Sequence, residues 1–110
     1  MSVIKKYWTE NVEITKLGSG STYSKCPRIE CADGFTMSVQ AGEGLYSTPR
    51  SYIESGDYSS FEIGFPSERE DLIMEYIDGD EETDPTDTVY GYVPIDAVDA
   101  VIEKHGGIAQ

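Results

Sequence analysis

The 110-residue sequence has few of the residues on which catalysis and metal binding usually depend. It contains one histidine and two cysteines, and its 8 lysines and arginines stand against 21 aspartates and glutamates. A single histidine provides no imidazole pair for a metal and no context for Ser-His-Asp or Cys-His chemistry. Phosphate contacts are made by lysine and arginine, so direct binding to nucleic acid or anionic membranes is disfavoured. We therefore expect no enzymatic activity, no cofactor and no dedicated metal site.

Long apolar runs are also missing. The first 14 residues, MSVIKKYWTENVEI, contain no apolar run that fits a signal peptide, and no stretch approaches the roughly 18 apolar residues of a membrane helix. With 38% hydrophobic and 26% charged residues, the composition is that of a folded chain. The sequence predicts a single cytoplasmic domain over residues 1–110.

Cys26 and Cys31, in CPRIEC, are too few for a structural zinc site, which needs four ligands, unless a dimer completes it. A disulfide is an alternative that the expected cytoplasmic location disfavours. The prediction is two ordinary thiols, with Cys31 facing the core beside Ile29. His105 is expected in the last turn of a helix, where its charge suits the helix dipole, although a role as a general base is the competing interpretation.

Alternating apolar residues predict several strands: 11–17, the two arms of a hairpin over 28–41, 60–65, 71–77 and 88–93. Asp33-Gly34 supplies the hairpin turn. Phe61, Ile63 and Phe65 are expected on the buried face of their strand. Residues 1–10 have no clear pattern, except that Tyr7 and Trp8 are expected to anchor the N-terminus to the core.

One helix is predicted at the C-terminal end. Pro94 suits its first turn, Val98, Val101 and Ile102 follow at helical spacing, and Gly106-Gly107 ends it. The sequence thus predicts an α+β fold: a curved antiparallel sheet of about five or six strands with one C-terminal helix packed on it.

The negative charge is concentrated in one segment. Residues 54–87 hold 13 acids and one base, whereas the remaining residues hold 8 acids and 7 bases, so a net charge of −12 out of −13 lies in this segment. Within it, the loop DGDEETDPTDTV does not match a calcium-binding EF-hand, because Thr83 and Val89 stand where glycine and glutamate are required. Weak cation binding by the loop stays an alternative.

Two interpretations of the acidic segment remain. It is either a solvated loop that confers solubility, or a surface that competes with nucleic acid for a basic groove. Twelve charges correspond to roughly 20 Å of duplex DNA, about the length of a six-residue strand, so imitation of DNA is feasible. The acidic residues would provide the electrostatic attraction to the partner, and the tyrosines would provide aromatic contacts in the interface. The predicted binding residues are Asp78, Asp80, Glu81, Glu82, Asp84 and Asp87, extended by Glu68, Glu70, Asp71 and Glu75, with Tyr76, Tyr90 and Tyr92 as anchors.

Several phrases of the sequence resemble small proteins encoded in bacteriophage and prophage genomes. These are CPRIECADGFTMSVQAGEGLYSTPR, FEIGFPSE, LIMEY and TDTVYGYVPIDAVDAVIEKHGGI, which cover most of the chain after residue 26. The resemblance implies a phage context, in which small acidic proteins often inhibit host defence as anti-CRISPR or anti-restriction proteins, several of them by imitating DNA. It carries no functional residue over position by position.

The resulting hypothesis is a non-enzymatic acidic protein that occupies the basic surface of a bacterial nucleic-acid-handling or defence protein. An immunity protein that neutralises a basic nuclease toxin is a second interpretation. A phage structural or accessory protein, whose acidity only confers solubility, is a third.

Overall fold

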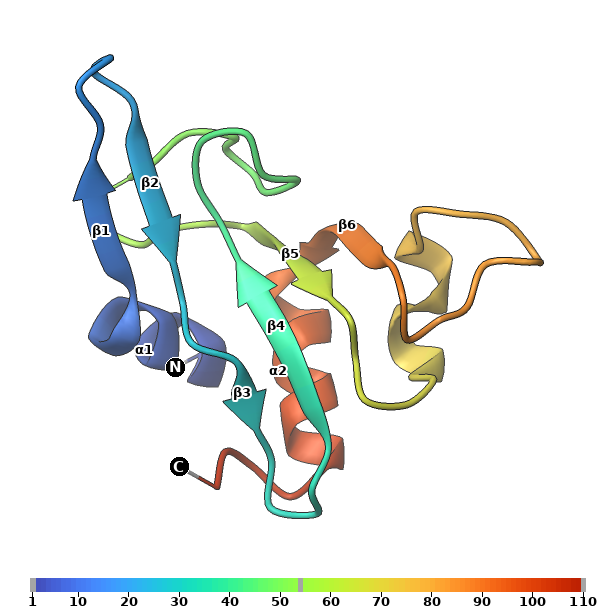
Figure 1. The fold of residues 1–110 in the computed structure, drawn as a ribbon. Coiled ribbons are helices and arrows are strands. Elements are labelled where there is room, and N and C mark those ends of the chain that lie inside the picture. The colour runs from blue at the N-terminus through green and yellow to red at the C-terminus, as the bar shows by residue number, and fades with distance from the viewer. Residues whose placement is uncertain (1, 54, 110) are drawn as a thin grey trace.

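The computed structural model describes residues 2–53 and 55–109 and has an α+β fold (Figure 1). The elements follow in the order α1 (Val3–Asn11), β1 (Glu13–Lys16), β2 (Thr22–Lys25), β3 (Ile29–Glu30), β4 (Thr36–Gln40), β5 (Ser60–Gly64), the 3-10 helix η1 (Asp71–Tyr76), β6 (Val89–Pro94) and α2 (Ile95–Lys104). The strands form two antiparallel sheets, β1-β2 and β3-β4-β5-β6. The α+β class is confirmed, but the single sheet and the single helix are wrong.

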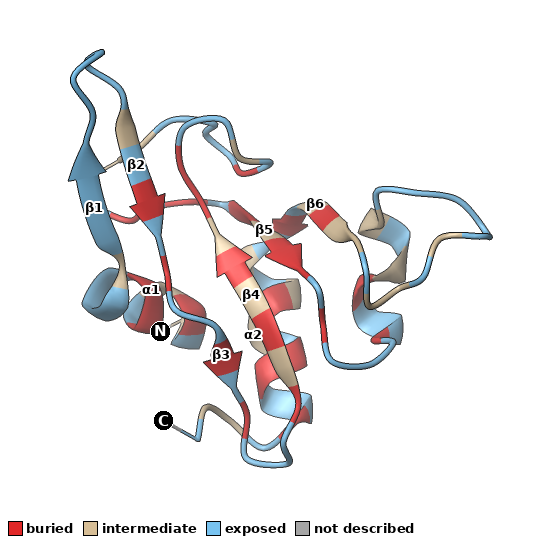
Figure 2. Cartoon of the chain, viewed as in Figure 1, coloured by how far each residue is buried: buried red, intermediate tan, exposed pale blue. Residues whose placement is uncertain are grey.

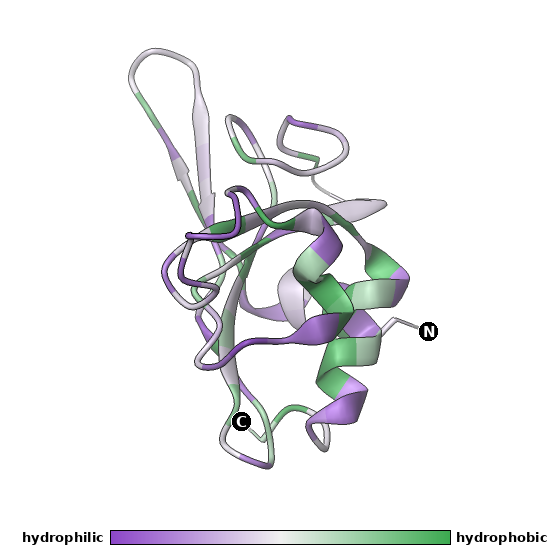
Figure 3. Ribbon diagram, turned by 90° about the vertical axis from the view of Figure 1, so that its right-hand side faces the viewer, coloured by the Kyte–Doolittle hydropathy of each residue, from purple (hydrophilic) through white to green (hydrophobic). Residues whose placement is uncertain are grey.

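The sheet is divided at Pro27, which lies between β2 and β3 and has no backbone N–H to donate to a ladder. The side chain of Gln40, on β4, takes over the pairing there. Its Oε1 accepts from the Cys26 N–H at 2.8 Å, and its Nε2 donates to the Cys26 carbonyl at 2.8 Å. Beyond this point β1 and β2 project from the body as a two-stranded ribbon (Figures 1 and 3), and every residue of β1 is exposed.

Helix α1 was not predicted, although its sequence carries the signals. The Ser2 hydroxyl accepts from the Lys5 N–H at 3.1 Å, which caps the first turn. Ile4, Tyr7 and Trp8 follow at helical spacing and are buried, which confirms Tyr7 and Trp8 as anchors. The Ile4 N–H donates to Asp99 Oδ1 at 2.8 Å and so joins α1 to α2.

The hairpin of β3 and β4 is confirmed. Ile29 pairs with Met37 and Glu30 with Thr36, around a turn in which Gly34 has a φ of 96°. Asp33 Oδ1 accepts from the Phe35 N–H at 2.9 Å, which fixes the turn. The inward-facing residues are all buried, as predicted: Ile29, Cys31, Phe35, Met37, Val39 and Ala41.

Strands β5 and β6 are also confirmed, with one correction. Phe61 and Ile63 are buried, but Phe65 is exposed and has a φ of 50°. Strand β5 ends at Gly64, and the left-handed backbone at Phe65 turns its side chain away from the face that Ile63 occupies. The alternation therefore stops one residue earlier than predicted.

The predicted strand over residues 71–77 is wrong, because residues 71–76 form η1. Glu70 caps it: a carboxylate oxygen accepts from the Leu72 N–H at 2.9 Å. Glu70 and Ile73 are buried three residues apart, whereas Leu72 is exposed, which is the period of a 3-10 helix rather than of a strand.

Helix α2 is confirmed, and it packs against the four-stranded sheet with Val98, Val101 and Ile102 buried (Figure 2). Gly106 and Gly107 both have positive φ and end it. The chain then returns to the sheet, where the Ala109 N–H donates to the Glu30 carbonyl at 2.8 Å. Among the described residues, no helix is long and apolar enough to cross a membrane.

Candidate interaction surface

The part of the acidic segment over residues 68–87 lies at one end of the molecule, where η1 and the loop over residues 78–88 are neighbours (Figure 1). The two are held together by β6: Ile77 pairs with Tyr90, and the Asp78 N–H donates to the Val89 carbonyl at 2.9 Å. Nine of the ten predicted binding acids are exposed: Glu68, Asp71, Glu75, Asp78, Asp80, Glu81, Glu82, Asp84 and Asp87. We call these nine residues the acidic face.

The loop of the acidic face is organised by its own side chains. Asp80 Oδ1 accepts from the Glu82 N–H at 2.9 Å, and Asp84 Oδ1 accepts from both the N–H and the hydroxyl of Thr86. These hydrogen bonds lower the pKa of Asp84 below its usual value of 3.8. Thr88 adds a hydrogen bond from its hydroxyl to the Asp78 carbonyl at 2.7 Å. The carboxylates are thus displayed on a loop with a defined backbone.

Little positive charge offsets this face. Arg69 is the only base in residues 54–87, and its Nε donates to Asp71 Oδ1 at 2.8 Å on the surface. The hydrogen bond from Arg69 lowers the pKa of Asp71. No second lysine or arginine lies in residues 54–87, so the acidic face produces a strongly negative local field.

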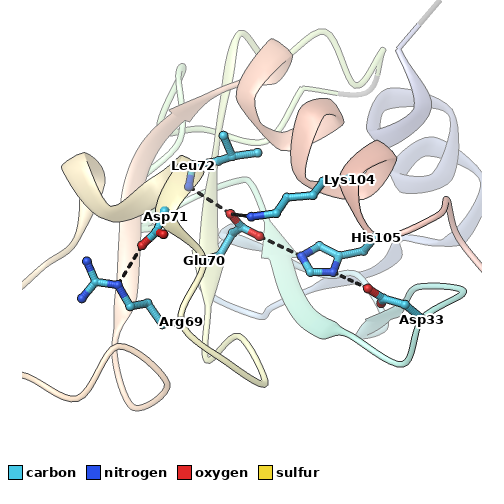
Figure 4. Close-up of polar contacts among 7 residues, drawn as sticks. All are labelled: Asp33, Arg69, Glu70, Asp71, Leu72, Lys104 and His105. Atoms are coloured by element: carbon cyan, nitrogen blue, oxygen red, sulfur yellow. Dashed lines mark hydrogen bonds and ion pairs between the residues drawn. The ribbon is translucent and has the colours of Figure 1, made fainter.

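Glu70 does not belong to the acidic face, although the sequence predicts it there. Its side chain is 1% exposed and points inward to α2 (Figure 4). Glu70 Oε2 accepts from Lys104 Nζ and from the Leu72 N–H, both at 2.9 Å, and Oε1 lies 2.7 Å from His105 Nε2. Glu70 therefore joins η1 to the C-terminal end of α2 and cannot contact a partner.

His105 connects this carboxylate to a second one. Its Nδ1 lies 2.7 Å from Asp33 Oδ2 in the hairpin turn, so Asp33, His105 and Glu70 form a continuous chain across three elements (Figure 4). The imidazole stacks on Phe35, with ring centroids 4.0 Å apart and an angle of 9° between the planes. We call Asp33, Glu70, Lys104 and His105 the charge cluster.

The charge cluster favours its ionised state. Burial acts to lower the pKa of His105, but hydrogen bonds and charge attraction from Glu70 and Asp33 outweigh it and raise the pKa above 6.5. Burial acts to raise the pKa of Glu70, yet hydrogen bonds from Leu72, Lys104 and His105 bring it below 4.5. The pKa of Asp33 is lowered by its hydrogen bonds with the Phe35 N–H and with His105.

This arrangement has a structural consequence for His105. Each ring nitrogen is engaged by a carboxylate oxygen, so an imidazolium that donates two hydrogen bonds satisfies the cluster completely. In this geometry no ring nitrogen is free to accept a proton from a substrate. The sequence interpretation placed His105 at the end of a helix, and what it missed is the two carboxylates, which come from distant parts of the chain.

The three predicted tyrosine anchors differ in position. Tyr90 is fully buried, and its hydroxyl donates to the Pro85 carbonyl, so it supports the loop from below and cannot be a surface anchor. Tyr76 is half-buried, and Tyr92 is 45% exposed. A fourth tyrosine, Tyr46, lies beside Tyr92: the ring centroids of the two are 5.8 Å apart.

The cysteines are buried free thiols, as predicted. Burial raises the pKa of Cys26 to about 12 and also raises the pKa of Cys31, so neither is an activated nucleophile. Within residues 2–53 and 55–109, no group of three or more histidine, cysteine, aspartate or glutamate side chains is placed to hold a metal ion.

Comparisons with protein-family models, with curated proteins and with solved structures gave no match to this chain. The site must therefore be interpreted from its own geometry.

Proposed function

We propose that this protein is a non-enzymatic inhibitor that binds a basic surface of a bacterial nucleic-acid-handling protein through its acidic face. The observation that carries the proposal is the gathering of nine exposed carboxylates at one end of the molecule, on a loop and a helix of defined backbone. A disordered acidic tail would lose conformational entropy on binding, whereas this loop is already ordered by its Asx turns.

The class of partner follows from charge. A surface built to hold the phosphate backbone presents lysine and arginine at high density, and a fixed array of carboxylates attracts the same groups. Such an array speeds encounter and selects basic partners, while aromatic side chains supply interface energy. Tyr92 and Tyr46 are exposed next to the acidic face and suit that second role. A phage-encoded protein acting in the bacterial cytoplasm on a defence complex fits this chemistry.

The test is a charge reversal that spares the fold. Within the described part of the chain, the carboxylates of Glu81, Glu82 and Asp87 are exposed and make no hydrogen bond or ion pair. The variant Glu81→Lys/Glu82→Lys/Asp87→Lys should therefore keep its thermal midpoint. The matched control is Glu10→Lys/Glu13→Lys/Glu103→Lys, which changes the net charge equally at exposed sites elsewhere.

Both variants and the native protein are used as bait in a bacterial lysate at low salt, beside an unrelated folded protein of equal net charge. We expect a partner that the native bait and the control variant retain, that duplex DNA displaces, and that the 81/82/87 variant loses. Retention of the same basic proteins by the unrelated bait would show that the acidity serves only solubility. Unchanged capture by the 81/82/87 variant would also refute the proposal.

A further inference from the structure

A shallow pocket of 230 Å³ lies beside the acidic face, and its walls are mainly tyrosine. Three separate segments contribute: the loop before β5, the end of η1 with the start of the acidic loop, and β6. The lining residues are Tyr46, Tyr76, Ile77, Asp78, Gly91 and Tyr92. We call it the tyrosine pocket.

A β-bulge in β6 builds one wall of the pocket. Phe61 pairs with Val93 but Ile63 pairs with Tyr90, so the ladder gains an extra residue at Gly91 and Tyr92. Tyr92 adopts a φ of 53°, a left-handed conformation that is uncommon for an aromatic residue. The bulge turns this ring outward, where it is 45% exposed. A costly backbone at an exposed tyrosine is a feature that points to a role for its side chain.

The opposite wall is tied to the bulge by hydrogen bonds. The Tyr92 N–H donates to the Tyr46 carbonyl at 2.9 Å, and the Tyr46 N–H donates to Glu62 Oε2 at 2.9 Å. A Cβ at position 91 would lie 3.2 Å from the Tyr46 Cβ, so the glycine there lets Tyr46 approach closely. The two rings are inclined at 39° to each other and are held by the backbone.

The chemistry of the pocket selects a cation. Aromatic faces carry negative potential, and the exposed, acidic residue Asp78 is part of the lining. Burial raises the pKa of Tyr76, and the neighbouring charge of Glu75 raises it further, so this phenol stays neutral and presents an aromatic ring rather than a charge. An anion would be repelled, and an apolar ligand would leave the Asp78 carboxylate without a partner.

The chain itself places a guanidinium over one of these rings, that of Tyr46. Arg50, which is not among the lining residues, lies with its Cζ 5.2 Å from the centroid of the Tyr46 ring and donates from Nε to the Leu45 carbonyl at 3.1 Å. A planar guanidinium stacks on tyrosine and forms a fork to a carboxylate, which a compact ammonium cannot do equally well.

From these observations we infer that the tyrosine pocket binds an arginine side chain of the partner, with the guanidinium against the exposed surfaces of Tyr46 and Tyr92 and paired with Asp78. This inference rests on the proposed function, since it names the group on the basic partner that the acidic face receives. An arginine that otherwise contacts phosphate would be removed from its nucleic acid in this way.

The experiment compares two fluorescent peptides, each with six cationic residues separated by glycine, one with arginine and one with lysine. Their dissociation constants are measured by anisotropy at low salt. The native protein should bind the arginine peptide more tightly than the lysine peptide. Tyr92→Gly should raise the dissociation constant of the arginine peptide by about three- to tenfold and remove the difference between the two peptides. Glycine removes the ring and relaxes the left-handed backbone, so the variant keeps the fold. Tyr23→Ala is the matched control, because Tyr23, on β2, is 54% exposed against 45% for Tyr92.

A second measurement locates the bound group directly. Titration of the labelled native protein with N-acetyl-L-arginine methylamide should shift the ring protons of Tyr46 and Tyr92 and leave those of Tyr23 in place. If Tyr92→Gly binds both peptides as the native protein does, or if these rings do not respond, the pocket is not an arginine site, and the proposal for the acidic face stands unaffected. If Tyr92→Gly weakens binding while the 81/82/87 reversal does not, the pocket stands and the acidic-face proposal fails.

Discussion

Glu70 and its neighbours Glu68 and Asp71 are adjacent in sequence, yet they lie in opposite environments. Glu70 is buried in the charge cluster, whereas the other two are exposed on the acidic face. The buried carboxylate is surrounded by donors from Leu72, Lys104 and His105, whereas the exposed ones face solvent, Asp71 with a surface ion pair to Arg69. The same chemical group therefore supports the fold in one place and produces an external field in the other. Burial and partners, not residue type, decide which.

The largest expected effect comes from removing the buried member of this comparison. Glu70→Ala deletes the cap of η1, removes the carboxylate that Lys104 contacts and leaves His105 with Asp33 alone. Loss of one partner from a buried ion pair costs about 3 kcal/mol or more, so we expect a decrease of that size in the free energy of unfolding. Urea denaturation followed by tryptophan fluorescence measures it, because Trp8 is buried.

Two variants make this result specific. Glu68→Ala removes an exposed carboxylate from the same segment and should change stability by no more than about 0.5 kcal/mol. Glu70→Gln keeps an acceptor for the Leu72 N–H but loses the charge. Its decrease in the free energy of unfolding should therefore lie between those of Glu68→Ala and Glu70→Ala. Equal effects of Glu70→Ala and Glu68→Ala would show that the charge cluster contributes nothing to the fold.

The second prediction concerns pH and is smaller. The pKa of His105 is raised in the folded state, so its contribution to stability is complete below 6.5 and is lost as the pH rises through the folded value. The pKa of Glu70 is lowered, so its contribution is complete above 4.5 and is lost as the pH falls through the folded value. The cluster should therefore stabilise most between these limits, and the thermal midpoint should fall on going from pH 6 towards pH 9.

The growing negative net charge also lowers the thermal midpoint at alkaline pH. A variant is therefore needed to separate the contribution of His105 from this general effect. His105→Gln keeps hydrogen-bonding capacity but does not titrate, and every surface carboxylate stays in place. Between pH 6 and pH 9, the thermal midpoint of the native protein should fall by more than the thermal midpoint of His105→Gln. Parallel curves for the two proteins would show that imidazolium formation does not support the fold.

The parts of the fold that were predicted depend on local pattern. Alternation around Asp33-Gly34 gave the hairpin of β3 and β4, and the spacing of Val98, Val101 and Ile102 gave α2. The division of the sheet at Pro27 depends on the distant Gln40 side chain, which no local pattern shows. Helix α1 could have been predicted from the sequence, because Ser2 is a favourable N-cap and Ile4, Tyr7 and Trp8 follow at helical spacing.

For the candidate site, the sequence located the acids but not their environments. Nothing in DLIMEYI distinguishes a strand from a 3-10 helix until Glu70 is known to fold back on Leu72 and to meet Lys104 and His105. Tyr90 and Tyr92 look equivalent in TVYGYV, and only the bulge places one inside and the other outside. Asp33 reaches His105 across 72 positions of sequence, a contact that spacing cannot reveal.

The smallest expected effect comes from the exposed side of the comparison, and its sign is opposite. Neutralising three carboxylates with Glu81→Gln/Glu82→Gln/Asp87→Asn removes like-charge repulsion and breaks no hydrogen bond among the described residues. The free energy of unfolding at low salt should rise by less than about 1 kcal/mol, since exposed charges interact weakly. At about 1 M salt the Debye length is near 3 Å and the difference from the native protein should vanish. A loss of stability that salt does not change would instead place these acids among the groups that hold the loop, and the distinction between the charge cluster and the acidic face would no longer hold.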